Sequence, residues 1–93
     1  MNIEFEWDEE KNAFNKKKHN ITFEEAEKVF LDPKHIVMFD KEHSLYEERW
    51  KIVGFSGFAL LSVIFTKRDN SFRIITARKA DKDEEEDYFY GYS

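Results

Sequence analysis

Basic side chains are concentrated in the second half of this sequence, in a pattern that is typical of phosphate binding. Between positions 49 and 79 the one acid is Asp69, and seven residues are lysine or arginine: Arg49, Lys51, Lys67, Arg68, Arg73, Arg78 and Lys79. The whole chain has a formal net charge of −5, and residues 81–87, DKDEEED, hold six acids and one lysine. Residues 1–80 hold 14 acids and 14 bases, so the residues after them carry the whole surplus. This distribution indicates an anionic partner.

Other catalytic constellations are missing from the sequence. The three histidines, His19, His35 and His43, have no HxxxH spacing and no set of acids around them, so we expect no metal site. The three glycines form no glycine-rich phosphate loop, and no serine lies in a Gly-x-Ser-x-Gly segment. We therefore expect no cofactor, and the basic segment is the main candidate site.

Length and composition indicate one small globular domain over residues 1–93, with a single modest core. The hydrophobic content of 41%, with 10 Phe, 4 Tyr and 2 Trp, excludes a disordered chain. The absence of cysteine excludes disulfides and thiolate metal sites and suits a reducing compartment. The first ten residues do not resemble a secretion signal, and the longest apolar run, FALL, is too short to cross a bilayer. We expect a cytoplasmic protein.

The elements that must position the basic residues begin with a strand and a helix. IEFEW alternates apolar and acidic residues, which predicts a short strand over residues 3–7. Asp8 is expected to cap a helix over 8–19, with acids in its first turn and lysines in its last, and Asn20 to end it. On this interpretation the cluster NKKKHN, residues 15–20, stabilises a helix end through the dipole.

A second helix is predicted over residues 23–31. Thr22 and Glu25 have the spacing of a capping box, and Asp32-Pro33 ends the helix because proline disfavours helical geometry in the residue before it. The side chains expected to face inward are apolar and recur with helical spacing: Phe23, Ala26, Val29 and Phe30.

From residue 35 the pattern becomes that of strands. Four segments are rich in β-branched and aromatic residues, HIVMF, YEERWKIVGF, FALLSVIFT and SFRIITAR, and short links with turn residues separate them. They predict an antiparallel meander in which LLSVIF is central. The segment from Asp81 predicts a last helix. The fold class is then α+β, with helices covering one face of the sheet.

Strand alternation predicts where the basic side chains point. Arg49 and Lys51 lie opposite in phase to Trp50 and Ile52, so they belong on the open face of the sheet. Arginines on such a face form a phosphate-binding surface.

The last strand leaves an ambiguity, because Arg73 and Arg78 are five residues apart and would point to opposite faces of a regular strand. Either the strand bends, or Arg78 belongs to the turn that follows it. The alternative to a binding surface is a solvated face on which Glu47 or Glu48 pairs with Arg73.

The sequence also resembles the BrnT family of ribonuclease toxins. The resemblance rests on FEWDEEKNAFNKKKHNITFEEAEKVFLD, EERWKIVGF, LLSVIFTKR and RIITARKA, and it runs from Phe5 to about Ala80. It implies a RelE-like fold, in which two N-terminal helices pack on an antiparallel meander of about four strands, followed by a C-terminal helix. It also implies an endoribonuclease that inhibits translation and is neutralised by a BrnA-like ribbon–helix–helix antitoxin. Such a complex represses its own operon, touching operator DNA only through the antitoxin.

Relatives of this fold cleave RNA without metal, by attack of the 2′-hydroxyl, which requires a base, an acid and cations around the phosphorane. The resemblance suggests His19 as base or acid, Glu48 as base if it is desolvated, and three arginines on the phosphate: Arg49, Arg73 and Arg78. Further RNA contacts would come from Lys18, Lys51 and Arg68. Alternatively, Lys18 is a helix cap and His19 packs at the helix end.

The acidic segment after Ala80 departs from the family pattern, which often continues with more arginines. An acidic helix would repel RNA locally. It lies away from the cleavage face, or weakens RNA contact, or serves the antitoxin. A non-catalytic nucleic-acid-binding or partner-binding module is therefore the competing function.

Overall fold

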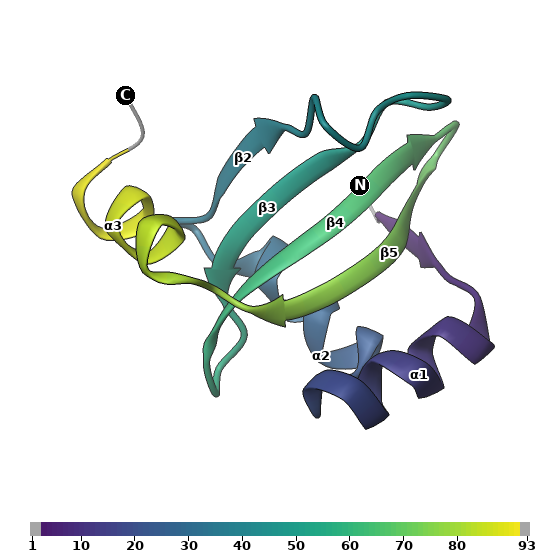
Figure 1. The fold of residues 1–93 in the computed structure, drawn as a ribbon, viewed down its shortest axis with the longest axis horizontal. Helices are drawn as coiled ribbons and strands as arrows, with labels where there is room; N and C mark the ends of the chain where they lie inside the picture. Colours follow the sequence, from purple (N-terminus) through teal and green to yellow (C-terminus); the bar gives the residue numbers. More distant parts are fainter. Residues whose placement is uncertain (1–2, 92–93) are drawn as a thin grey trace.

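The computed structural model describes residues 3–91, which form a five-stranded mixed sheet with helices packed against it (Figure 1). The elements in chain order are β1 (Glu4–Glu6), α1 (Glu9–His19), α2 (Phe23–Glu27), the 3-10 helix η1 (Lys28–Leu31), β2 (Ile36–Phe39), β3 (Trp50–Phe55), β4 (Leu60–Arg68), β5 (Ser71–Lys79) and α3 (Lys82–Tyr90). The strand order is β1-β5-β4-β3-β2, and β2 to β5 pair antiparallel. The predicted meander and the central position of LLSVIF, in β4, are confirmed.

The expectation of a four-stranded antiparallel sheet is wrong in one respect, because β1 adds a fifth strand parallel to β5. Glu4 lies opposite Ser71 and Glu6 opposite Arg73. Between them Phe5 packs on Phe30, with ring centroids 4.9 Å apart. Burial of this aromatic side chain stabilises β1, because the backbone hydrogen bonds of a three-residue strand alone would hold it only weakly on β5.

The strand predicted from residue 46 begins instead at Trp50, and residues 40–49 form a loop between β2 and β3. Leu45 and Tyr46 are almost fully exposed, so the apolar side chains of this stretch have no core to fill. Backbone pairing nevertheless closes the base of the loop, where the Asp40 N–H donates to the Arg49 carbonyl at 2.9 Å.

The helix ends follow the capping signals. Asp8 accepts from the amides of Glu10 and Lys11, and Asn20 ends α1 in the left-handed region at φ 59°. Thr22 accepts from the Glu25 amide, whereas the Glu25 carboxylate accepts from Ser56 rather than completing a capping box. The predicted helix over 23–31 is present in two parts. The α-helix α2 ends at Glu27, and the chain continues as the 3-10 helix η1 to Leu31.

The core lies between the sheet and the two N-terminal helices. Figure 1 shows α1 and α2 on one side of the sheet, with α3 at the opposite end of the molecule from β1. The predicted inward-facing residues Phe23, Ala26 and Val29 are fully buried, and Phe30 packs against them. The sheet contributes Ile52, Leu61, Val63, Phe65, Ile74 and Ala77 to this core.

Asn15 of α1 completes the edge of β5 that β1 leaves open. Its side-chain oxygen accepts from the Ala77 amide at 3.2 Å, and its Nδ2 donates to the Ala77 carbonyl at 2.8 Å. The same Nδ2 donates to the Ile21 carbonyl at 2.9 Å. One buried side chain therefore replaces a neighbouring strand and fixes α1 on the sheet.

Replacing Asn15 by Asp should destabilise the fold by about 3 kcal/mol, because a carboxylate cannot donate to the two buried carbonyl oxygens. Urea unfolding followed by circular dichroism measures the loss. Lys17→Ala, an exposed position on the same helix, is the control and should change stability by less than about 0.5 kcal/mol. Equal stability of the two variants would show that Asn15 does not hold the β5 edge.

Candidate functional site

A bulge in β5 decides which basic side chains share a face. Ile64 pairs with Thr76 and the next residue, Phe65, pairs with Ile74, so Ile75 has no partner on β4. The extra residue inverts the alternation. Ile74 and Ala77 both enter the core, and Arg73 and Arg78 both lie on the open face. Of the two alternatives drawn from the sequence, the bent strand is correct.

The open face contains a hollow of about 350 Å³ near its centre. Three cations converge on it: Arg49 and Lys51 from the start of β3, and Arg78 from β5. Ile64 of β4 and Thr76 of β5 also line the hollow. The end of β2 and the loop after it contribute Met38, Phe39, Asp40, Glu42 and His43. The predicted phase of Arg49 and Lys51, opposite to Trp50 and Ile52, is confirmed.

Glu84 of α3 engages two of these cations. Its side chain is 3% exposed, and it accepts two hydrogen bonds from Arg78, at 2.8 and 3.0 Å. The Lys51 ammonium lies at 2.8 Å, and the Ser62 hydroxyl donates at 3.1 Å. Burial alone would raise the pKa of Glu84, but the bonds from Arg78 and Lys51 outweigh it and lower the pKa to about 2.

The position of Glu84 corrects one expectation and excludes one of the three alternatives for the acidic segment. The sheet is not covered on one face alone, because α3 lies against one end of the face opposite α1 and α2. The acidic segment likewise does not lie away from the basic surface. A second anchor fixes α3, since the Tyr88 hydroxyl donates to Asp32 at 2.6 Å. Burial and this bond to the carboxylate raise the pKa of Tyr88 to about 12.

Arg49 is the cation of the hollow with the fewest partners. Its side chain is 31% exposed and approaches Glu47 at 3.7 Å. Its Nε is buried and has no hydrogen-bond partner among the described residues. A partly exposed guanidinium whose ion pair is this long is suited to binding a planar or tetrahedral oxyanion.

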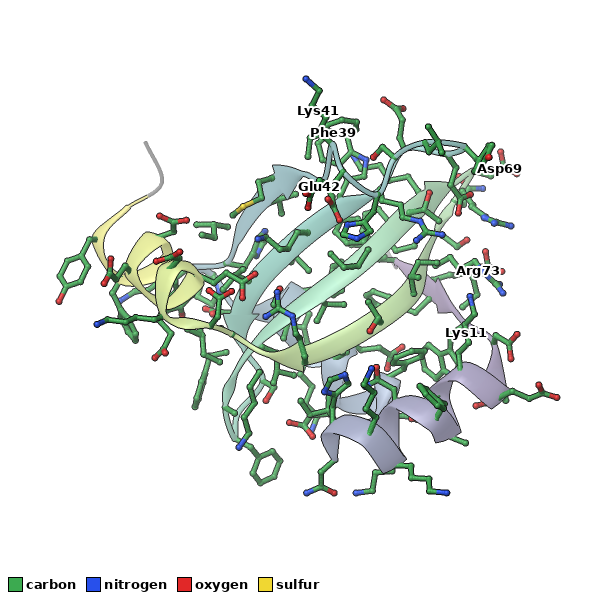
Figure 2. All side chains as sticks on the ribbon, in the orientation of Figure 1. Lys11, Phe39, Lys41, Glu42, Asp69 and Arg73 are labelled. Atoms are coloured by element: carbon green, nitrogen blue, oxygen red, sulfur yellow. The ribbon has the colours of Figure 1, made fainter. Side chains whose placement is uncertain are left out.

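Several predicted site residues lie outside the hollow. Arg73 pairs with Glu6 at 3.8 Å, and Arg68 pairs with Glu47 at 3.4 Å, so ion pairs of the kind that the alternative offered are present, but Arg73 pairs with neither Glu47 nor Glu48. The Glu48 side chain is exposed and does not meet the desolvation that a carboxylate base requires. Figure 2 shows Arg73 well apart from Glu42, which marks the loop end of the hollow.

Lys18 and His19 lie at the end of α1 and do not line the hollow. Lys18 is exposed, with its ammonium 5.9 Å from the ring centroid of Phe14, and His19 is half-buried. This geometry agrees with the interpretation of NKKKHN as a helix end.

Two residues of the hollow were not identified from the sequence as a site. Asp40 and His43 lie three residues apart, and the His43 Nδ1 is 2.8 Å from the Asp40 carboxylate. The signal was present as Asp-x-x-His in the segment DKEHS, which sequence reasoning treated only as a turn. A loop residue becomes a site residue here because the β2–β3 pairing places this loop beside the arginines.

The fold and the hollow together define a small α+β protein with a mixed sheet and a basic, arginine-lined site on the sheet's open face. The sequence profile described as "Ribonuclease toxin, BrnT, of type II toxin-antitoxin system" matches residues 7–84, and the chain belongs to that family. The fold is similar to the crystal structure of the Brucella abortus ribonuclease toxin, BrnT, with a TM-score of 0.68 and 24% identity. That match covers 87% of this chain and 100% of the other. No curated protein matches the chain.

Two further observations bound the chemistry of residues 3–91. Within this range no group of three or more His, Cys, Asp or Glu side chains is arranged to hold a metal ion. None of the described helices has the length and apolar character needed to cross a membrane.

Replacing Glu84 by Gln should lower the free energy of unfolding at pH 7 by about 3 kcal/mol, from the shift of its pKa from 4.5 to about 2. Because the folded-state pKa is depressed, this stabilisation is complete above about pH 5 and is lost as pH falls toward 2. The difference between wild type and Glu84→Gln should therefore shrink across that range in urea titrations. Glu85→Gln, an exposed acid on the same helix, is the control and should show a much smaller difference.

Proposed function

We propose that this ribonuclease toxin is an endoribonuclease that binds RNA across the hollow and cleaves it without a metal ion. The attacking group would be the 2′-hydroxyl, which supplies the nucleophile from the substrate itself. The observation that carries this proposal is the convergence of Arg49, Lys51 and Arg78 on one hollow of the open face. Cations fixed around one point stabilise the additional charge of a phosphorane more than that of the phosphodiester.

Arg49 is assigned the leading role on the phosphate, because its partly exposed guanidinium lines the hollow and its ion pair with Glu47 is long, at 3.7 Å. Arg78 is held rigidly by Glu84, and a rigid donor loses little entropy when the transition state forms. Lys51 supplies a further positive charge from the neighbouring strand. Arg73 and Arg68 lie beyond the hollow at the β4–β5 turn end of the sheet, and in this proposal they contact the RNA backbone on one side of the cleaved bond.

Cleavage of cellular RNA would inhibit translation in the cytoplasm. The partner that neutralises the toxin would be a BrnA-like ribbon–helix–helix antitoxin, and the complex would repress its own operon. Contact with operator DNA would come through the antitoxin alone, because this chain has a net charge of −5.

A non-catalytic binding module is the competing proposal, and one observation favours it. Glu84 already satisfies Arg78 and Lys51, so the charge available to a substrate phosphate is lower than the count of cations implies. The two proposals differ in their products. Purified protein is incubated with single-stranded RNA in excess EDTA, and the ends of the fragments are identified by mass spectrometry. Fragments with 2′,3′-cyclic phosphate ends support the nuclease, and bound but intact RNA supports the binding module.

The basic hollow, rather than the lysine cluster of α1, should determine toxicity. Arg49→Ala and Arg78→Ala should each slow RNA cleavage at least about 100-fold, equivalent to about 3 kcal/mol of transition-state stabilisation. Lys16→Ala should cleave like the wild type, because it removes one exposed charge from a helix end. Cleavage rates and growth arrest on induced expression are the measurements, with folding confirmed by circular dichroism. If the Arg49 and Lys16 variants are equally active, the hollow is not the cleavage site.

The antitoxin should cover the hollow, since that blocks RNA and pairs the arginines with acids on the partner. In hydrogen–deuterium exchange the loop of residues 40–49 should become protected in the complex, while exchange at the β4–β5 turn changes little. An unprotected loop in a complex that no longer cleaves RNA would place inhibition elsewhere.

A further inference from the structure

We propose that His43 accepts the 2′-hydroxyl proton during RNA cleavage and that Asp40 is its positioning residue. The inference rests on the proposed ribonuclease function and assigns a base to it. Among the three histidines of the chain, His43 lines the hollow in which Arg49, Lys51 and Arg78 converge. An imidazole is the side chain best suited to proton transfer near neutral pH.

The loop that carries His43 is fixed by hydrogen bonds at its base. The Asp40 amide donates to the Arg49 carbonyl at 2.9 Å. The Ser44 hydroxyl contacts the carbonyls of Asp40 and Arg49 and accepts from the Arg49 amide at 2.9 Å. One serine therefore ties both ends of the loop together, and the residue before it is His43. The imidazole is consequently held at a set place beside Arg49.

Asp40 defines the state of the ring. Its carboxylate lies 2.8 Å from the His43 Nδ1 and also accepts from the His43 amide at 3.4 Å. The Asp40 side chain is 14% exposed, whereas that of His43 is 62% exposed. A carboxylate partner selects the tautomer with hydrogen on Nδ1, which leaves the Nε2 lone pair as a proton acceptor. It also stabilises the imidazolium that forms after proton transfer.

The reaction step balances with this single base and solvent. The 2′-hydroxyl gives its proton to Nε2 of His43 as the O2′–P bond forms. The P–O5′ bond then breaks, and the leaving 5′-oxygen takes a proton from water. The products are a 2′,3′-cyclic phosphate and a 5′-hydroxyl, and the imidazolium returns its proton to the hydroxide produced. Arg49 and Arg78 carry the charge of the phosphorane between these events.

The other two histidines do not have these features. The His35 Nδ1 lies 2.7 Å from the backbone carbonyl of Asp32, outside the hollow, and its ring is exposed. His19 lies at the end of α1. His35 therefore provides a matched control, since it is an exposed loop histidine with an oxygen at a similar distance from Nδ1.

The charges facing His43 come from three elements and its own loop. Asp40, Glu42, Glu47 and Arg49 belong to the loop, Lys51 lies in β3, Arg78 projects from β5, and Glu84 of α3 lies against Lys51 and Arg78. If His43 is the base, wild-type kcat/KM falls at acidic pH, where the imidazole is protonated. Replacing His43 removes that limb of the profile.

The test compares His43→Ala, Asp40→Asn and His35→Ala with the wild type. His43→Ala should cleave single-stranded RNA about 100-fold more slowly, lose the acidic limb and recover activity on addition of free imidazole. Asp40→Asn should lower kcat about tenfold or more with little change in KM. His35→Ala should match the wild type. Affinity for a DNA oligonucleotide of the same sequence, which has no 2′-hydroxyl, should be unchanged in His43→Ala and His35→Ala, and it should not fall in Asp40→Asn, which removes a negative charge from the hollow.

Three results would overturn the assignment. If the wild type cleaves RNA and His43→Ala cleaves equally fast, His43 is not the base although the ribonuclease function stands. If His43→Ala loses DNA affinity in proportion to its loss of cleavage and imidazole restores nothing, His43 only supports the loop. If the wild type leaves RNA intact, the proposed function itself fails and the assignment with it.

Discussion

The buried carboxylate of Glu84 is the constraint on which the open face of the sheet depends. A charge with 3% exposure is stable only with close partners, and Arg78, Lys51 and Ser62 supply them from three adjacent strands. Those contacts place α3 against the face opposite α1 and α2, and they fix the Arg78 guanidinium. The acidic helix α3 therefore helps to build the basic face of the sheet. The hollow lies beside the part of that face that α3 covers.

The hollow also depends on the β5 bulge, which puts Arg78 on the open face of the sheet. From the sequence, the bulge was one of two alternatives. Strand alternation puts Arg73 and Arg78 on opposite faces unless one residue is skipped. No property of Ile75 alone says that it is the skipped residue. The choice is made by packing, because Ile74 and Ala77 both fill the core and must point the same way. The residue pattern of β5 alone does not show that both side chains must point into the core.

Most local signals predicted the structure correctly, as did the meander, whereas the contacts made by the two ends of the chain were not predicted. Caps such as Asp8, Asn20 and Asp81 act within a few residues, so the sequence predicts them directly. The parallel pairing of β1 with β5 joins residues far apart in the chain. The selection of Glu84 from six neighbouring acids depends likewise on which helix face meets the sheet. His43 was missed for another reason: the pairing of β2 with β3 was predicted, but the loop between these strands was interpreted only as a turn.

The balance of charge around the hollow determines how it can act on RNA. Lys51 and Arg78 pair with Glu84, and Asp40 lines the same hollow as Arg49, in a chain with a net charge of −5. Such a surface exerts little long-range attraction on a polyanion. Any selectivity of the hollow for a phosphate group must therefore come from the short-range geometry of the contacts between fixed guanidinium donors and the phosphate. In the proposed cleavage, such a site would contribute little to ground-state association and most to the phosphorane, whose additional charge the three cations would stabilise.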